Sequence, residues 1–309
     1  MTIFFVNPGA PFDFERSAGM HGRFQKGLPD LYEEDAYKRV VHLGRKPVLI
    51  IAWSIGTIQK PRIRIEAYPS LSVPEQRSLR DLLGRMFRSQ FDYKGFRRVA
   101  RKDPIMNLIS RELAGLRPTA PPTIFEALVI AITEQQISLD AAISIRARLV
   151  EKYGDVVRFR GRKFYAFPTA KSLATASPAQ MRAIGLSRNK ALYISELARK
   201  IERRELDLES LRAMDDETAV AELTKIKGIG RWSAEYTLVR GMGRVNSLPA
   251  DDLGIQRAAS RAYFRGKRVG PKEVRGLLDK FAPYSGIAAL YLMYHQFWLA
   301  NREQTHSPA

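Results

Sequence analysis

A long run of helical segments constrains this chain most. From Pro104 onward, almost every patterned stretch repeats its apolar residues every three to four positions, which is typical of amphipathic helices. The predicted helices cover residues 105–115, 123–138, 139–153, 169–174, 178–184, 187–202, 207–213, 216–226, 231–241, 252–265, 271–280 and 284–300. The pattern breaks only around residues 158–167, where a short hairpin or a loop fits. We therefore predict an all-α domain over residues 103–309.

The first third of the chain has a different pattern. Residues 48–53 form an apolar run typical of a buried strand, and residues 62–67 alternate polar and apolar as a half-exposed strand does. Gly56 and Pro61 lie between them and fit a hairpin connection. Helical spacing follows at residues 79–87. The prediction is an α+β fold, with a small sheet-containing domain at residues 1–102 before the larger helical domain.

The charge balance points to a polyanionic partner. The chain has 51 Lys and Arg against 32 Asp and Glu, for a formal net charge of +19. DNA, RNA and an anionic membrane surface would all satisfy this excess, because attraction to phosphate does not depend on sequence. No apolar run is long enough to span a membrane. We expect an intracellular protein, cytoplasmic and nucleoid-associated or nuclear, without a membrane partner.

Cysteine is absent, which excludes disulfides, thiolate zinc sites, iron–sulfur clusters and cysteine nucleophiles. The histidines are far apart in the sequence, at His21, His42, His295 and His306. None has the close spacing that places two imidazoles on one helical face. A histidine-rich catalytic metal site is therefore not expected.

Two glycines around one apolar residue join two predicted helices at Gly228-Ile229-Gly230. Glycine permits the backbone angles of a tight turn, and Ile229 is placed to enter the core. The turn and the start of the next helix expose N–H groups that suit a phosphate, with Lys227 and Arg231 beside them. An ordinary pair of helices with a glycine cap has the same local pattern.

Two further motifs accompany this hairpin. Downstream, Leu248-Pro249-Ala250 is an apolar, proline-containing loop that leads to Asp251 and Asp252 at the start of a predicted helix, where an N-cap belongs. Upstream, residues 131–138 end one predicted helix with the sequence Ala-Ile-Thr-Glu-Gln-Gln-Ile-Ser.

Together these motifs resemble the helix–hairpin–helix superfamily of DNA glycosylases, and within it the 3-methyladenine (alkylpurine) branch. The resemblance spans roughly residues 105–300. It implies an enzyme that flips a damaged base out of double-stranded DNA and cuts the base–sugar bond. By its position after Pro249, Asp251 matches the catalytic aspartate of the family. Asp252 matches the less critical residue that follows, and its role can be that of an N-cap alone.

The resemblance also implies the other site residues. Bifunctional members carry a lysine where this chain has Trp232, so a monofunctional enzyme without abasic-site lyase activity is implied. Trp232, Tyr236 and Tyr284 match an aromatic pocket that would hold a cationic alkylated base, although core packing is the competing interpretation of these side chains. Gln136 aligns with the residue that fills the hole left by the flipped base, and Ser138 ends the same DNA-facing segment.

No cofactor is expected to be required. In some members the hairpin carbonyls bind a structural Na⁺ or K⁺, and here these would belong to Thr224, Ile226 and Ile229. Each chain contains all residues of one active site and needs none from a second copy, so a monomer is expected.

Two alternatives stay open at this point. The same chemistry would serve hypoxanthine, 1-methyladenine or another modified base. A non-catalytic DNA-binding protein explains the charge equally well, but it gives no use for an acidic pair in a DNA-facing loop of so basic a protein.

Overall fold

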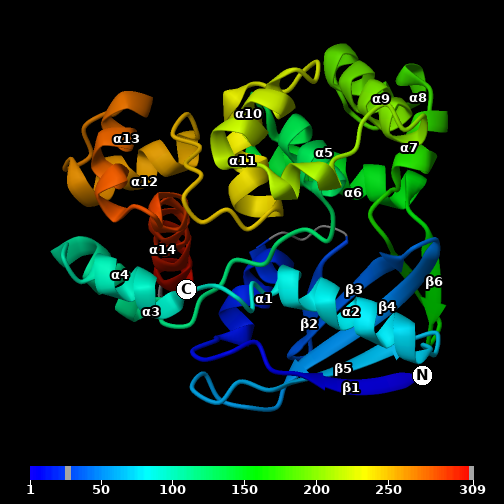
Figure 1. The fold of residues 1–309 in the computed structure, drawn as a ribbon, viewed down its shortest axis with the longest axis horizontal. Helices are drawn as coiled ribbons and strands as arrows, with labels where there is room; N and C mark the ends of the chain where they lie inside the picture. The colour runs from blue at the N-terminus through cyan, green and yellow to red at the C-terminus, as the bar shows by residue number, and fades with distance from the viewer. Residues whose placement is uncertain (25–28, 306–309) are drawn as a thin grey trace.

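The computed structural model describes residues 1–24 and 29–305 (Figure 1). Its N-terminal part is an antiparallel sheet with the strand order β1-β5-β4-β3-β2. The strands are β1 (Thr2–Val6), β2 (Leu31–Glu33), β3 (Ala36–Leu43), β4 (Lys46–Ser54) and β5 (Ile63–Tyr68). Helices α1 (Phe14–Phe24) and α2 (Val73–Met86) pack on the same sheet.

The patterns that predicted strands and a helix here are confirmed. β4 and β5 pair from Ser54↔Ile63 onward, so the segment with Gly56 and Pro61 is their hairpin connection. Ser72 caps α2 and forms a capping box with Glu75, which fixes where that helix begins. The apolar face of α2 then packs with the inner face of the sheet in one core. β1, β2, β3 and α1 were not predicted from the sequence.

The rest of the chain is mostly helical, and the α+β architecture is confirmed. The helices are α3 (Tyr93–Ala100), α4 (Pro104–Glu112), α5 (Ile124–Glu134), α6 (Leu139–Tyr153), α7 (Ala170–Thr175), α8 (Pro178–Arg182), α9 (Arg188–Glu202), α10 (Asp216–Thr224), α11 (Arg231–Gly241), α12 (Leu253–Tyr263), α13 (Pro271–Leu278) and α14 (Ser285–Thr305), with short 3-10 turns η1 (Glu209–Ala213) and η2 (Asp279–Phe281). The helix predicted over residues 123–138 ends at Glu134, and residues 135–138 form a turn.

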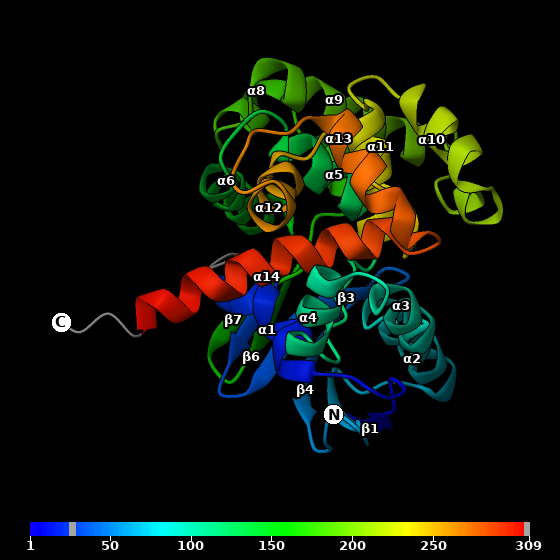
Figure 2. The same ribbon diagram turned by 90° about the vertical axis from the view of Figure 1, so that its left-hand side faces the viewer.

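The helices divide into two cores. One core contains side chains of α5 to α11, and the other contains side chains of α3, α4 and α12 to α14. Figure 2 shows α14 running between α12 and α13 on one side and α3 and α4 on the other. α3 shares this second core with α4. The domain boundary expected at residue 102 therefore falls between two helices that pack together.

One hairpin makes the second part of the chain less than all-α. β6 (Val156–Phe159) and β7 (Arg162–Tyr165) pair where the helical pattern breaks. The hairpin lies against the N-terminal sheet, with Phe164 and Ala166 buried in the same cluster as residues of β3 and β4. An apolar strand face needs a partner surface, and the sheet supplies it.

Within residues 1–24 and 29–305, none of the helices combines the length and apolar character that crossing a membrane requires.

Candidate functional site

The hairpin between α10 and α11 has the geometry that its sequence predicts. Gly228 has a φ of 87°, in the left-handed region that favours glycine, and Ile229 is buried in the core. The N–H of Ile229 donates to the carbonyl of Ile226 at 3.0 Å, which closes the turn. A Cβ on Gly228 would lie 2.2 Å from the ring of Tyr193 on α9. The close approach of that ring is therefore a second reason for glycine here.

The start of α11 is open. Gly230 is its N-cap residue, and no side chain of the described residues caps this helix end. Nothing lies within 4 Å of the place where a Cβ of Gly230 would be. The first N–H groups of α11 are thus accessible to an anion, and the helix dipole favours negative charge at this end.

We predict that Gly228→Ala destabilises this hairpin and weakens binding to DNA. The left-handed backbone alone costs an alanine about 1–2 kcal/mol, and the contact with Tyr193 adds to that. Chemical denaturation and a DNA titration would measure both effects. Gly230→Ala is the matched control for stability, because its backbone is extended and its Cβ meets open space; equal losses of stability in both variants would contradict the explanation.

The acidic pair lies at the start of α12, and its two members differ. Asp252 is the N-cap residue: its Oδ1 accepts the N–H of Ile255 at 3.0 Å, and its Oδ2 accepts the indole N–H of Trp232 at 3.2 Å. Asp251 is exposed, and no side-chain hydrogen bond joins it to another described residue. The structure therefore brings Asp252, and not the expected Asp251, to the aromatic residues of α11.

The loop before α12 is held rigidly enough to fix Asp252. Leu248 and Ala250 are buried, the N–H of Asp252 donates to the carbonyl of Pro249 at 3.0 Å, and the amide of Gln256 donates to the carbonyl of Ala250 at 3.0 Å. The apolar residues of the motif thus anchor the loop in the core, and the cap then directs the carboxylate of Asp252 toward Trp232.

Two of the three expected pocket aromatics lie together. The rings of Trp232 and Tyr236 are 5.4 Å apart, one helical turn apart on α11. Tyr284 lies elsewhere: its ring contacts Phe91 and Phe96, and its hydroxyl donates to Asp92 at 2.8 Å. The structure thus places the ring of Tyr284 in the aromatic cluster around α3, and its role in the base pocket stays a prediction.

A cavity of about 440 Å³, including its open mouth, adjoins Tyr236. Its walls come from the N-terminal sheet and from α5, α6 and α11, and they are more charged than the predicted aromatic pocket. The lining residues are Pro29, Asp30, Arg39, Thr119, Ala120, Pro121, Glu126, Ile130, Glu134, Arg146, Tyr236 and Arg240. The sequence did not single out any of these except Tyr236 as part of a pocket.

Glu134, the last residue of α5, connects this cavity to the aspartate. Its carboxylate interacts with the hydroxyl of Tyr236 and lies 3.3 Å from the guanidinium of Arg146. Burial raises the pKa of Glu134, and the negative charge of Asp252 adds to the increase, while Arg146 and Arg240 oppose it. A continuous series of contacts, which we call the path, therefore leads from Asp252 through Trp232 and Tyr236 to Glu134.

The turn after Glu134 presents Gln136 to solvent. Gln136 has a left-handed backbone with a φ of 53°, and two exposed apolar residues, Ile137 and Leu139, follow it in the chain. Ser138 caps α6, accepting the N–H of Ala141 at 3.3 Å. Exposed apolar groups on a turn suit insertion between bases.

Hydrogen bonds from two side chains, those of Gln135 and Lys190, hold this turn in place. The amide of Gln135 donates to the carbonyl of Gly228 and to the hydroxyl of Ser233, both at 2.9 Å, so the turn is tied to the hairpin. The buried ammonium of Lys190 on α9 donates to the carbonyls of Thr133 at 2.9 Å and Gln135 at 2.5 Å. Lys190 was missed in the sequence, because one lysine in an amphipathic helix carries no signal of such a role.

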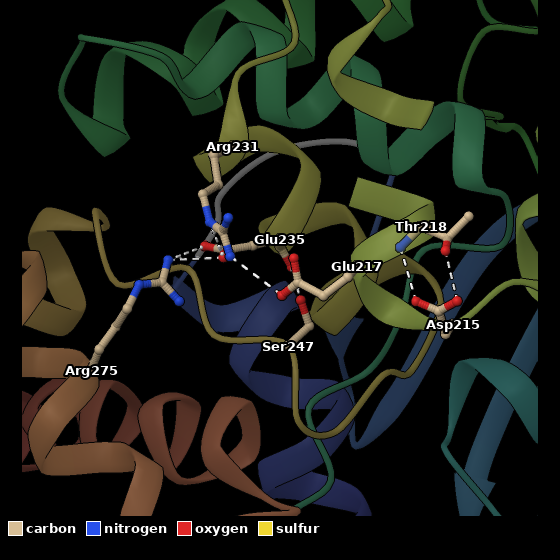
Figure 3. Close-up of polar contacts among 7 residues, drawn as sticks. All are labelled: Asp215, Glu217, Thr218, Arg231, Glu235, Ser247 and Arg275. Atoms are coloured by element: carbon tan, nitrogen blue, oxygen red, sulfur yellow. Dashed lines mark hydrogen bonds and ion pairs between the residues drawn. The ribbon is translucent and has the colours of Figure 1, made fainter. Parts of the chain in front are cut away.

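A buried carboxylate joins α11 to α13 (Figure 3). Glu235 is 3% exposed and lies 2.8 Å from the guanidinium groups of both Arg231 and Arg275. Burial raises its pKa, and the two arginines oppose the increase. The hydroxyl of Ser247 donates to the carbonyl of Glu235 at 3.2 Å, which links the acidic loop to the same cluster.

The charged residues beside the hairpin differ in their surroundings. Arg231 is half-exposed and shared between Glu235 and Glu217, whereas Lys227 extends into solvent with Glu196 4.0 Å away. Lys227 is therefore the freer of the two to meet a phosphate.

No cluster of three or more acidic, histidine or cysteine side chains able to hold a metal occurs in the part of the chain that the structure describes. His306 lies outside the described residues. Of the three residues whose carbonyls were expected to bind the ion, Thr224 ends α10, and Ile226 and Ile229 lie in the turn between α10 and α11.

Comparisons with known proteins agree on the family. Residues 129–283 match the family model of the HhH-GPD superfamily base excision DNA repair protein. The chain is 30% identical to the DNA-3-methyladenine glycosylase of Bacillus subtilis, over 65% of this chain and 66% of that protein. The 3-methyladenine DNA-glycosylase from Archaeoglobus fulgidus superposes with a TM-score of 0.83 at 29% identity, covering 96% of this chain and 99% of that one.

A further solved relative contains DNA. The 3-methyladenine DNA glycosylase of Schizosaccharomyces pombe, in complex with abasic DNA, matches with a TM-score of 0.55 at 25% identity over 65% of this chain and 95% of that one. The matches to the first curated relatives span only about half to two thirds of their length, namely 66%, 64% and 50%.

Proposed function

The chain belongs to the HhH-GPD superfamily of base excision DNA repair proteins, and on this premise we propose that it is a DNA glycosylase for alkylated bases of the 3-methyladenine type. It flips the damaged base out of duplex DNA and cleaves the bond between base and sugar. Relatives named as 3-methyladenine glycosylases, in sequence and in structure, support this choice of substrate.

The observation that carries the proposal is the position of one carboxylate. Asp252 lies at the start of α12, hydrogen-bonded to Trp232 and next to the path that leads through Tyr236 to the cavity. As the base leaves, the sugar develops positive charge, and a fixed carboxylate stabilises that charge or orients the attacking water. We assign this role to Asp252 in place of Asp251, which is exposed to solvent.

The residues around this site would bind the DNA backbone and fill the space left by the flipped base. The open N-terminus of α11 at Gly228 and Gly230 would bind one backbone phosphate, with Lys227 close by, and Arg231 would add charge from its exposed side. Gln136, followed by the exposed Ile137, would fill the space left by the flipped base, and Ser138, the N-cap residue of α6, would contact the DNA from the same turn. A Na⁺ or K⁺ at the carbonyls of Thr224, Ile226 and Ile229 would strengthen the phosphate site.

We further propose that the enzyme is monofunctional. A lyase of this superfamily needs an amine to attack the sugar, and Trp232 occupies that position, with its indole N–H already donated to Asp252. The product would be an abasic site in an intact strand. One chain contains the hairpin, the aspartate and the cavity, so a monomer acting on intracellular DNA is sufficient.

The test is base release from duplex DNA treated with a methylating agent and, in parallel, from duplex DNA that contains hypoxanthine, followed by chromatography of the free bases. The strands are then examined before and after alkali. Free methyladenine with strand breaks only after alkali is the expected result. Breaks without alkali would contradict the assignment of Trp232, release of hypoxanthine alone would change the substrate, and no release from any modified DNA would leave a non-catalytic DNA-binding protein.

A further inference from the structure

The cavity next to Tyr236 contains a largely buried hydrogen-bond acceptor, the carboxylate of Glu134. Aromatic rings alone can bind a cationic base, so this carboxylate needs a separate explanation. Glu134 is 15% exposed in its side chain and lines this cavity with Tyr236. An ionised carboxylate offers about four lone-pair sites. Even if the hydroxyl of Tyr236 and the guanidinium of Arg146 each take one of them, the carboxylate has acceptor capacity for a further donor.

The neighbours of Glu134 fix its orientation and its charge. Tyr236 from α11 and Arg146 from α6 both interact with the carboxylate, so the group is oriented before any base arrives. Arg240 lies over the ring of Tyr236 at 5.9 Å and also interacts electrostatically with Glu134. Arg146 and Arg240 oppose the increase in the pKa of Glu134 that burial causes, so they favour the ionised form of the carboxylate, which acts only as an acceptor.

We propose that Glu134 is a specificity-determining residue that selects flipped bases presenting an N–H donor, with the amino group of a methylated adenine as the best partner. This inference rests on the proposed function. A methylated adenine carries a positive charge, so its N–H···O⁻ contact with Glu134 is a charge-assisted hydrogen bond, which is stronger than a neutral one. In a base whose exocyclic nitrogen is closed into a ring, that nitrogen is a hydrogen-bond acceptor. It would face the carboxylate of Glu134, a second acceptor, with no water between them, and this arrangement is unfavourable.

Glu134→Gln tests the proposal with almost no change in shape. The amide oxygen can still accept from Tyr236 and Arg146, and the amide nitrogen then presents a donor to the cavity. The two substrates are methylated duplex DNA, which releases methyladenine, and a duplex with one 1,N6-ethenoadenine, which has no N–H on that edge. Rates are measured under single-turnover conditions, so that product release does not contribute.

The variant should release methyladenine about ten- to a hundredfold more slowly, as expected for one lost charge-assisted hydrogen bond. Its release of ethenoadenine should be unchanged or faster. Because the comparison is between variant and wild type on each substrate, the different sizes and intrinsic reactivities of the two bases cancel. Binding to duplex DNA with an abasic-site analogue should stay at the wild-type level, since no base then enters the cavity.

Glu126→Gln is the matched control. Glu126 is also a buried carboxylate in the wall of this cavity, but it is paired with Arg39. That variant should lose stability without changing the ratio of the two release rates. An equal shift of the ratio in both variants, equal loss of both substrates in Glu134→Gln, or weaker binding to the abasic analogue would each overturn the role of Glu134. A wild-type protein that releases neither base would refute the proposed function itself, whereas release of methyladenine with an unchanged ratio would refute only this inference.

Discussion

Replacing Asp252 by Asn should reduce base release by about a hundred- to a thousandfold, the range seen when one group that stabilises developing charge is removed. Asparagine caps helices as well as aspartate does, so α12 should begin at the same place. Its side-chain oxygen can still accept the N–H of Ile255 or of Trp232. The substitution therefore removes the negative charge and little else.

The matched control is Asp251→Asn, one residue earlier in the same loop. Asp251 is exposed, and no hydrogen bond links its side chain to the described residues, so base release should stay near the wild-type rate. Both variants should bind DNA at least as tightly as the wild type, because each loses a negative charge near phosphates. Single-turnover release from methylated DNA and a DNA titration would measure these effects. A large loss in Asp251→Asn with normal activity in Asp252→Asn would restore the assignment made from the sequence.

The difference between these two aspartates shows what the sequence motif left open. Counting forward from Pro249 selects Asp251, whereas counting back from the first turn of α12 selects Asp252. Only the observed cap, in which Asp252 accepts the N–H of Ile255, shows where that helix begins. Helix ends are the least certain part of any pattern, and the error here is a single residue.

The hairpin was predictable because its constraint is local. Glycine at position 228 and an apolar residue at 229 are needed for the turn itself, and the structure shows the positive φ and the buried side chain. Strands β4 and β5 were predictable for the same reason, since each has its own periodicity. β3 was missed because Lys38 and Arg39 interrupt its apolar pattern; both are buried, and ion pairs compensate their charges.

The cavity was not predictable because its walls are assembled from distant segments. Asp30 and Arg39 come from the N-terminal sheet region, Glu134 from the end of α5, and Tyr236 from α11. A charged residue in a single helix is typical of a solvated face, so none of these positions stands out alone. The surroundings of Tyr284 were not predictable either, because the contacts of its ring with Phe91 and Phe96 join segments far apart in the sequence.

The largest effect on stability is expected at the contact between the sheet and α5. Arg39 on β3 pairs with Glu126 on α5, and their side chains are only 3% and 4% exposed. Arg39 also binds Asp30 at 2.6 Å. Replacing Arg39 by Met would leave the charge of Glu126 buried without its partner. Breaking one side of such a pair typically costs about 3–5 kcal/mol of unfolding free energy.

The double variant Arg39→Met with Glu126→Leu separates the cost of an unpaired charge from the cost of lost packing. Two apolar side chains of similar size can replace a buried ion pair with little net loss, since neither leaves a charge to be desolvated. Asp30 would keep its contact with solvent, because its side chain is 19% exposed. The double variant should therefore unfold at a higher denaturant concentration than Arg39→Met alone, as chemical denaturation would show. If both variants lose the same stability, the pair contributes through packing, and the sheet and α5 are not held together by charge.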